Sequence, residues 1–259
     1  MPEKVRTYES PAIRIVYDPV RCIHAAECVR GLRAVFDPDR RPWIDPSNAA
    51  ADDVAAVISR CPTGALAYER LDAGPPESTP SVNVVTVSAD GPLLFRGRVI
   101  VRRADGTTGA ELRLALCRCG GSANKPLCDG RHHARAFTDP GDVGRLGEPG
   151  FDPDGPLEVT PQSNGPLVVR GRFMLVDGRG EDRGVFDKAA FCRCGASSTK
   201  PFCDGSHVAA GFTADRECAR RCPRAPNGMS ATASLATPTG PNRTDSSARW
   251  STGSPAVAS

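Results

Sequence analysis

Large hydrophobic side chains are scarce in this sequence. Phe, Trp and Tyr make up only 5% of its 259 residues, whereas 24 residues are Pro and 26 are Gly. A chain of this kind builds small cores, and small cores usually need disulfides or metal ions to be stable. The 11 Cys and 4 His are the side chains that can provide such cross-links.

A long apolar run is also missing. No apolar segment follows Met1–Arg6 and no stretch approaches the length of a membrane span, so neither a signal peptide nor a transmembrane helix is predicted. An odd number of cysteines without an export signal favours a reducing compartment and metal binding over disulfides. We therefore expect a cytoplasmic protein without a membrane partner.

A strong net charge and catalytic motifs are absent as well. The net charge of +3 is too small to indicate a polyanionic partner, and the basic residues are not interleaved with aromatic ones, so we expect no nucleic acid partner. The sequence shows no nucleophile with a base, no phosphate-binding loop and no substrate pocket. It therefore predicts no catalytic reaction of its own.

What the sequence does contain is a stretch that occurs twice. Residues 117–132 and 192–207 share the pattern Cys-x-Cys-x8-Cys-Asp-Gly-x-His, which places three thiols and one imidazole at identical offsets. This is a full set of soft ligands for one metal centre. The similarity extends further, since residues 91–98 match 165–172. The duplicated unit is therefore about 55 residues long.

The duplicated stretch resembles the CDGSH iron–sulfur domain, also called the NEET family, and the second copy contains Cys-Asp-Gly-Ser-His literally. The resemblance implies one [2Fe-2S] cluster in each copy. By position, the implied ligands are Cys117, Cys119, Cys128 and His132 in the first copy and Cys192, Cys194, Cys203 and His207 in the second. Domains of this family pair about a two-fold axis. Two copies in one chain can form this pair as an internal pseudo-dimer, so no homodimer is required and a monomer is compatible with the resemblance.

The repeat distinguishes between two neighbouring histidines. His132 aligns with His207, whereas His133 aligns with Val208, so His132 is the predicted ligand. The first copy departs from the family pattern at Arg131, which replaces a small residue. We expect Arg131 to crowd the cluster mouth or to add positive charge there.

The ligand types indicate the chemistry of these centres. Two Cys one residue apart can share one iron, and the third Cys and the His can hold the other. A neutral imidazole in place of a thiolate raises the reduction potential of the cluster. Histidine can also be protonated near physiological pH at the expense of its bond to iron, which makes a cluster pH-sensitive and releasable. The competing interpretation is a structural zinc site, since three Cys and one His also suit zinc.

Two of the few lysines, Lys125 and Lys200, occupy matching positions in the two copies. One interpretation is a cation held beside each cluster, where it tunes the reduction potential. The other interpretation is chance placement of exposed cations.

A third cysteine set precedes the repeat. Cys22, Cys28 and the distant Cys61, which is followed by Pro, resemble the divergent single-cluster ferredoxin domain. The middle slot of the local cysteine group, position 25, is Ala. Three thiols suit a [3Fe-4S] cluster, or a [4Fe-4S] cluster whose fourth iron takes another ligand. His24, beside the empty slot, is the candidate for that ligand; the alternative is a solvent-facing loop histidine.

Together these segments predict an α+β protein with a small ferredoxin-like domain followed by two β-rich CDGSH units. The predicted boundaries are residues 1–70 for the ferredoxin-like domain, 71–80 for a linker, 81–138 for the first CDGSH unit, 139–156 for a second linker, 157–223 for the second CDGSH unit and 224–259 for a disordered tail.

Local patterns predict the elements of the first domain. Residues 12–17 and 67–69 read as strands, and Trp43-Ile44 as a short one. A helix after Cys28 is expected to continue through Val35-Phe36.

The remaining elements are a second helix and the strands of the repeat. The second helix, with an apolar stripe at Val54, Val57 and Ile58, is expected to be capped by Ser47 or Asn48. In the first repeat, residues 82–87, 93–95, 99–101 and 112–116 predict separate strands.

Three hypotheses of function follow. The first is electron transfer between unidentified redox proteins, with two [2Fe-2S] clusters and one ferredoxin-type cluster. The second is cluster storage, cluster transfer to an apo-acceptor, or redox and pH sensing. The third is a zinc-stabilised binding module without a redox role. Cys218 and Cys222, four residues apart, are a redox pair, an accessory metal site or two incidental thiols.

Overall fold

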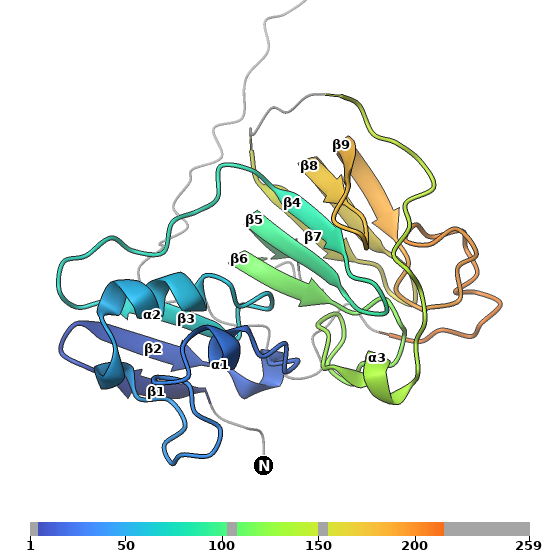
Figure 1. The fold of residues 1–259 in the computed structure, drawn as a ribbon. Helices are drawn as coiled ribbons and strands as arrows, with labels where there is room; N and C mark the ends of the chain where they lie inside the picture. The colour runs from blue at the N-terminus through green and yellow to red at the C-terminus, as the bar shows by residue number, and fades with distance from the viewer. Residues whose placement is uncertain (1–4, 103–107, 150–154, 215–259) are drawn as a thin grey trace, which may run out of the picture. The chain divides into compact units, whose positions relative to one another are not determined.

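The N-terminal module is a three-stranded antiparallel sheet combined with two helices (Figure 1). This computed structural model describes residues 5–102, 108–149 and 155–214. The elements of the module are β1 (Arg6–Glu9), β2 (Ile13–Tyr17), η1 (Pro19–Arg21), α1 (Glu27–Gly31), η2 (Pro46–Asn48), α2 (Ala51–Ile58) and β3 (Leu66–Arg70). The sheet order is β1-β2-β3.

Alternation along β2 builds the core of this module. Every second residue of the strand, Ile13, Ile15 and Tyr17, is buried, as expected when one face of a sheet is covered. The helix α2 covers this face with its apolar stripe. The buried residues of that stripe are Ala51, Val54, Val57 and Ile58.

Two helix predictions for this module are wrong. The helix α1 ends at Gly31 rather than at Val35-Phe36, because Leu32 leaves the helical conformation with φ −157° while its N–H still bonds the carbonyl of Cys28. Ser47 and Asn48 do not cap α2, because they lie in η2, a separate 3-10 turn.

Two strand predictions also differ from the structure. Trp43-Ile44 does not form a strand; Ile44 makes only a single bridge with Phe36. The strand β1 was not predicted, because most of it is exposed and it lacks an alternating apolar pattern.

The duplicated region forms a second, six-stranded sheet. Its strands are β4 (Val84–Val87), β5 (Leu93–Arg102), β6 (Thr108–Leu116), β7 (Leu157–Pro161), β8 (Leu167–Val176) and β9 (Asp182–Phe191), and its one helix among the described residues is α3 (Arg131–Ala134). Each copy contributes three strands in the same order. The mixed helix and strand content agrees with the predicted α+β class.

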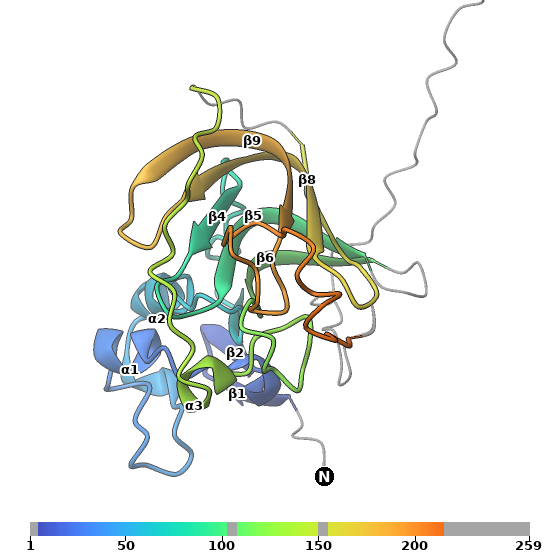
Figure 2. The ribbon, with the colours of Figure 1, turned by 90° about the vertical axis from the view of Figure 1, so that its right-hand side faces the viewer.

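Every pairing in this sheet has a counterpart in the other copy. The strand β4 pairs β5 antiparallel, as β7 pairs β8, and β6 flanks β5 as β9 flanks β8. The two parallel pairings, β4 with β8 and β5 with β7, cross from one copy to the other. Figures 1 and 2 show the two sets of strands interleaved in this way.

A glycine interrupts the register of each long strand, Gly97 in β5 and Gly171 in β8. Their φ angles are 141° and 105°, which only glycine adopts readily. A Cβ at Gly171 would lie 2.6 Å from the carbonyl oxygen of Pro156. The prediction of separate strands at 93–95 and 99–101 is therefore wrong, because the glycine bulges the strand without ending it.

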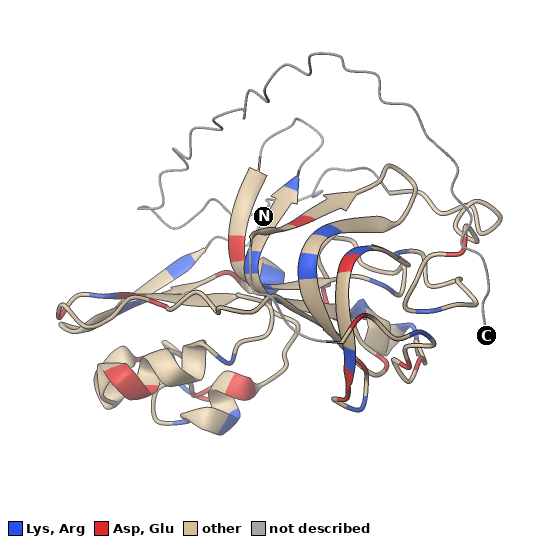
Figure 3. Ribbon diagram, turned by 90° about the horizontal axis from the view of Figure 1, so that it is seen from above, with Lys and Arg blue, Asp and Glu red and all other residues tan. Residues whose placement is uncertain are grey.

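Both copies share one hydrophobic core. Its residues come from all six strands and include Val85, Phe95, Leu114, Val159, Phe173 and Phe191. Basic and acidic positions both occur along the strands (Figure 3). No helix in the described residues is long and apolar enough to cross a membrane.

Some predictions fall outside the described residues. Cys218, Cys222 and the predicted tail 224–259 lie there, as does part of the predicted linker 139–156. Residues 71–80 form no helix or strand, but Glu77 in this segment is largely buried against β6, with a side chain 14% exposed.

Candidate metal centres

The first centre lies where β6 ends. The Sγ atoms of Cys117 and Cys119 are 3.7 Å apart, and Sγ of Cys128 lies 3.4 Å from Nδ1 of His132. None of these four residues is more than 6% exposed. The neighbouring His133 is exposed. The structure thus brings together the four residues that the pattern grouped, as two close pairs.

The second centre repeats this geometry after β9. The Sγ atoms of Cys192 and Cys194 are 3.6 Å apart, and Sγ of Cys203 lies 3.3 Å from Nδ1 of His207. Cys192 is buried, whereas the other three residues are partly exposed. The two copies therefore share ligand geometry but differ in exposure.

Backbone bonds to the strand hold each ligand loop. In the first copy, the N–H of Cys117 donates to the carbonyl of Pro126 and the N–H of Cys128 donates to the carbonyl of Ala115, both at 2.9 Å. The same two bonds recur in the second copy, between Cys192 and Pro201 and between Cys203 and Ala190, at 2.8 Å. In each copy, the first and third cysteines are thus anchored next to the end of the last strand, β6 in the first copy and β9 in the second.

The Asp of each Cys-Asp-Gly turn closes the loop. Asp204 accepts hydrogen bonds from the backbone N–H groups of Ser206 and Ser198 at 2.9 and 2.8 Å. Bonds from these two serines hold the pKa of the Asp204 carboxyl well below its usual range. In the first copy, Asp129 makes the corresponding turn and pairs at 3.6 Å with the exposed Arg131.

Burial and hydrogen bonding both shift the pKa values of these side chains. Burial raises the pKa of Cys128 to about 12 and lowers that of His132. The hydrogen bond with Cys117 lowers the pKa of Cys119 to about 6. The hydrogen bond with Cys119, followed by burial, raises the pKa of Cys117, and the charge of Lys125 opposes this rise. A metal at this centre must therefore displace protons from buried thiols.

The two predicted tuning lysines make equivalent contacts. Nζ of Lys125 donates to the carbonyl of Ser122 at 2.6 Å, and Nζ of Lys200 donates to the carbonyl of Ser197 at 2.5 Å. The ammonium of Lys125 also lies 5.8 Å from the ring centre of Phe212 in the other copy. Both ammonium groups are therefore held within their ligand loops.

Two buried arginines were not singled out from the sequence. Arg118 and Arg193, the middle residues of the two Cys-x-Cys groups, are each 1% exposed. Arg118 donates to the carbonyl of Gly91 at 2.7 Å and pairs with Asp139. Arg193 donates to the carbonyl of Gly165 at 3.0 Å. Both arginines occupy the same position in their copies of the repeat, and this match could have identified them from the sequence.

The two centres adjoin each other through a reciprocal contact. A Cβ at Gly195 would lie 2.7 Å from the carbonyl oxygen of Cys119, and one at Gly120 would overlap the carbonyl of Cys194. Each ligand loop thus packs its glycine on a candidate ligand of the other copy.

The N-terminal cysteines line one cavity. Cys22, Cys28 and Cys61 all border it, and so does Ala25 in the vacant slot. Burial raises the pKa of Cys28 to about 11, with smaller contributions in the same direction from the other two thiols. Sγ of Cys61 lies 3.6 Å from Oγ1 of the buried Thr63. The three thiols therefore face a common space.

His24 does not face this cavity. It is exposed, has a left-handed φ of 58° and is not among the lining residues. The structure brings the three cysteines together but leaves His24 on the outside, where the alternative interpretation placed it.

Two buried arginines connect this module with the first copy. Arg21, next to Cys22, pairs with Glu111 of β6 at 2.9 Å and donates to the carbonyl of Arg113 at 3.1 Å. In return, Arg113 donates to the carbonyl of Cys61 at 2.9 Å and contacts that of Ile58.

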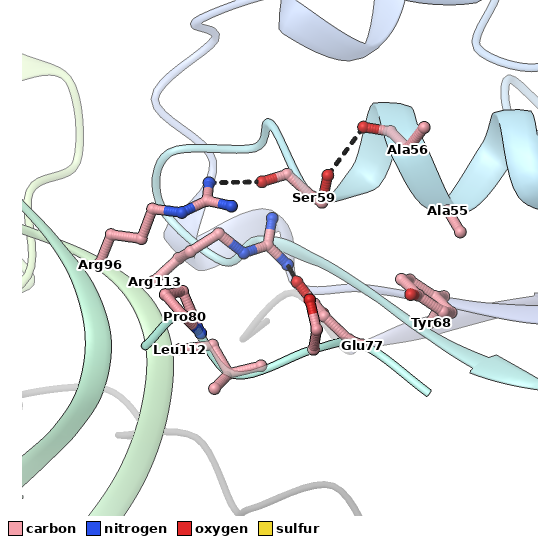
Figure 4. Close-up of a pocket in the computed structure, with 10 residues that line it drawn as sticks. Ala55, Ala56, Ser59, Tyr68, Glu77, Pro80, Arg96, Leu112 and Arg113 are labelled. Carbon is pink, nitrogen blue, oxygen red and sulfur yellow. Dashed lines mark hydrogen bonds and ion pairs between the residues drawn. The ribbon is translucent and has the colours of Figure 1, made fainter. Parts of the chain in front are cut away.

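The predicted linker completes this junction. Glu77 pairs with Arg113 at 2.6 Å, and both line a cavity of about 170 Å³ (Figure 4). Arg96, which also lines this cavity, donates to the carbonyl of Ser59 at 3.0 Å. Glu77, which lies in the predicted linker, thus neutralises Arg113 beside Cys61.

The donor sets fit clusters better than single ions. Two sulfur ligands at about 2.3 Å from one tetrahedral metal lie roughly 3.8 Å apart, close to the observed 3.7 and 3.6 Å. Within the described ranges, no three His, Cys, Asp or Glu side chains converge on a point that could hold one metal ion. Paired donors suit two metal atoms with two protein ligands each, and the residues present therefore fit a [2Fe-2S] cluster.

Comparisons with known proteins agree with this chemistry. The family model described as "Divergent 4Fe-4S mono-cluster" matches residues 8–71, and the model described as "Iron-binding zinc finger CDGSH type" matches residues 90–133 and 164–208. Proteins named "Uncharacterized protein YjdI" from Escherichia coli (strain K12) and Escherichia coli O157:H7 are each 38% identical over 63 residues, which is 24% of this chain and 83% of the relative. Both predicted resemblances are confirmed. The chain is therefore an iron–sulfur protein that combines a divergent 4Fe-4S mono-cluster domain with two tandem CDGSH-type units.

Proposed function

We propose that the protein is an electron carrier with two [2Fe-2S] clusters and one ferredoxin-type cluster of the [3Fe-4S] or [4Fe-4S] kind. Such clusters accept and donate single electrons. The observation that carries the proposal is the contiguity of the three centres. Ile23, which lines the N-terminal cavity, lies against Gly130 of the first copy, and Gly120 of that copy lies against Cys194 of the second.

The paired side chains are the proposed cluster ligands. Two of the pairs are Cys117 with Cys119 and Cys128 with His132, and the second copy supplies the corresponding pairs. Each pair holds one iron. For the N-terminal cluster we propose three protein ligands, Cys22, Cys28 and Cys61, because His24 is exposed and does not line their cavity. Lys125 and Lys200 raise the reduction potentials from within their loops.

The proposed architecture is an internal pseudo-dimer behind a ferredoxin-like domain. The paired strand contacts and the reciprocal packing of Gly120 and Gly195 support a pseudo-two-fold axis between the copies. A chain that completes this pair internally works as a monomer in the cytoplasm. Its partner is a redox protein.

Metal analysis with visible absorption and EPR spectroscopy tests this proposal. The protein purified without oxygen should contain about seven or eight iron atoms per chain, from two, two and three or four. After reduction it should pass electrons to oxidised cytochrome c without losing iron. A colourless, zinc-loaded protein contradicts the proposal and supports the zinc-stabilised binding module. An oxidised [3Fe-4S] signal would identify the N-terminal cluster.

Cluster transfer is the second candidate, and the partial exposure of His207 favours it. A histidine ligand that leaves on protonation releases its cluster. His207→Cys and the matched His132→Cys should both slow transfer to an apo-ferredoxin if the histidines serve release. Unchanged transfer with altered reduction potentials favours electron transfer instead.

A further inference from the structure

The two CDGSH-type centres are chemically alike but differ in accessibility. In the first centre Cys119, Cys128 and His132 are buried, at 6%, 3% and 5% exposure. The equivalent Cys194, Cys203 and His207 of the second centre are all partly exposed. Since the ligand spacing is the same, the difference must come from what surrounds each loop.

The N-terminal module covers the first loop. Nδ2 of Asn124 donates to the carbonyl of Val20 at 3.3 Å, and Asn124 is 5% exposed. A Cβ at Gly130 would lie 3.9 Å from Ile23. Both contacts come from the segment that leads into and follows Cys22, so the cover is part of the neighbouring cluster site.

Within the described part of the chain, no such cover lies at the equivalent positions of the second loop. Thr199, at the position of Asn124, is exposed. A Cβ built on Gly205, at the position of Gly130, would have no atom of the described residues within 4 Å. Both pairs of positions are equivalent in the repeat, and the ligand residues of the two loops are of the same types.

An arginine adds to the cover of the first centre. The aliphatic part of Arg135 lies on Gly121, two residues after Cys119. In the second copy the matching positions are Ala210 and Ala196, both exposed. The second copy therefore has neither the long side chain nor the glycine that accommodates it.

We infer that the two CDGSH-type centres have different tasks: the second exchanges electrons with an external redox protein, and the first relays them inside the chain. This inference rests on the proposed function, because it assumes a cluster at each centre. When the second centre is reduced, one electron leaves the donor and enters the cluster, and no bond in the chain forms or breaks. Electrons reach the first centre from the second centre or from the N-terminal cluster.

Proteins that retain one of the two centres test this difference. Cys117→Ser with Cys119→Ser leaves the second centre, and Cys192→Ser with Cys194→Ser leaves the first. Iron loss to 2,2′-bipyridine, an uncharged chelator, should be about tenfold faster from the second centre, because the first must open locally before the reagent enters. Reduction by a small flavin semiquinone should follow the same order. Equal rates, or faster loss from the first centre, would overturn the inference.

Substitutions that remove the covering side chains from the first centre, or add one to the second, provide the decisive control. Arg135→Ala should speed iron loss in the protein that retains the first centre. The double change Ala196→Gly with Ala210→Arg should slow it in the protein that retains the second. Asn124→Ala should act like Arg135→Ala, whereas the matched Thr199→Ala should change nothing. If Arg135→Ala, Asn124→Ala and the double change all leave the rate of iron loss unaltered, the inference is wrong.

The readouts separate this inference from the function on which it depends. Iron content and visible absorption report whether clusters are present, independently of the rates. Zinc-loaded protein overturns the proposed function and the inference together. Cluster-loaded protein with equal rates overturns the inference alone.

Discussion

The guanidinium of Arg113 donates a hydrogen bond to the carbonyl oxygen of Cys61 at 2.9 Å. Arg113 belongs to β6, the strand that leads directly into Cys117. It also bonds the carbonyl of Leu66 at 3.1 Å and is 5% exposed. One buried cation thus joins the backbone of the N-terminal centre to the strand that positions the first CDGSH-type centre.

Arg113→Gln is predicted to destabilise the protein and to lower the reduction potential of the N-terminal cluster. The change removes a buried charge that Glu77 neutralises, and breaking such a pair costs about 3–5 kcal/mol. It also removes the positive charge of Arg113 beside Cys61. This charge stabilises the reduced cluster, which is more negative than the oxidised one. Urea denaturation and EPR-monitored redox titration measure the two effects.

Arg96→Gln is the matched control for this substitution. Arg96 bonds the carbonyl of Ser59 near the end of α2 but is exposed. Its loss should change stability by less than about 1 kcal/mol and leave the potential unaltered. Equal effects of the two changes would show that burial of Arg113 is unimportant.

Glu77→Gln is predicted to alter how stability depends on pH. Burial raises the pKa of Glu77 above its usual 4.5, although Arg113 opposes the rise. The folded protein therefore binds this proton more tightly than the unfolded chain. Its contribution to stability is present below about pH 4.5 and is lost as pH rises through the folded-state pKa.

The difference in unfolding free energy between the wild-type protein and Glu77→Gln isolates this contribution. It should fall from about pH 4.5 upward, because only the wild-type protein has the titrating carboxyl. Urea denaturation of both proteins across this range measures it. A difference that rises with pH would mean that the ion pair with Arg113 outweighs burial.

The sequence predicts the ligand pairs because each pair is local. Cys117 and Cys119 are two residues apart, and Cys128 and His132 are four apart, so spacing alone places their side chains close together. The repeat then separates His132 from His133, because only one of them has a counterpart in the second copy. Arg118 and Arg193 carry the same repeat signal and were predictable from it.

The sequence does not reveal the contacts between modules. Glu77 lies in a segment with the composition of a linker. No local sequence pattern indicates that it pairs with Arg113, which is 36 positions later. Likewise, Asn124 and Thr199 are similar polar residues at one repeat position, and only packing on Val20 buries the first of them. These differences result from packing between residues that are far apart in the sequence. The periodicity of the sequence carries no information about such contacts.

Gly120→Ala and Gly195→Ala are each predicted to weaken both CDGSH-type centres. Both glycines have left-handed φ angles, 76° and 85°, which cost an alanine about 1–2 kcal/mol. Each Cβ would also collide with a candidate ligand of the other copy. Thermal unfolding and iron content per centre measure the effect.

Gly180→Ala separates strain from collision. Gly180 has the same φ of 85° as Gly195, but a Cβ there would meet no atom of the described residues within 4 Å. This control should lose only the stability due to backbone strain and should retain its full iron content. If Gly195→Ala behaves in the same way, the contact between the two loops does not support the clusters.

Arg118→Met and Arg193→Met are predicted to lower the reduction potential of the centre that each arginine adjoins. Each arginine is 1% exposed and lies in the sequence between two cysteines that would carry negative charge when they bind iron. Reduction adds a further negative charge, so loss of the cation disfavours the reduced state. Arg118→Met also leaves Asp139 without its partner, and breaking this buried pair should cost about 3–5 kcal/mol of stability. Spectroelectrochemical titration of the single-centre proteins assigns each shift to its centre. An unchanged potential in both variants would mean that these arginines serve the loop fold alone.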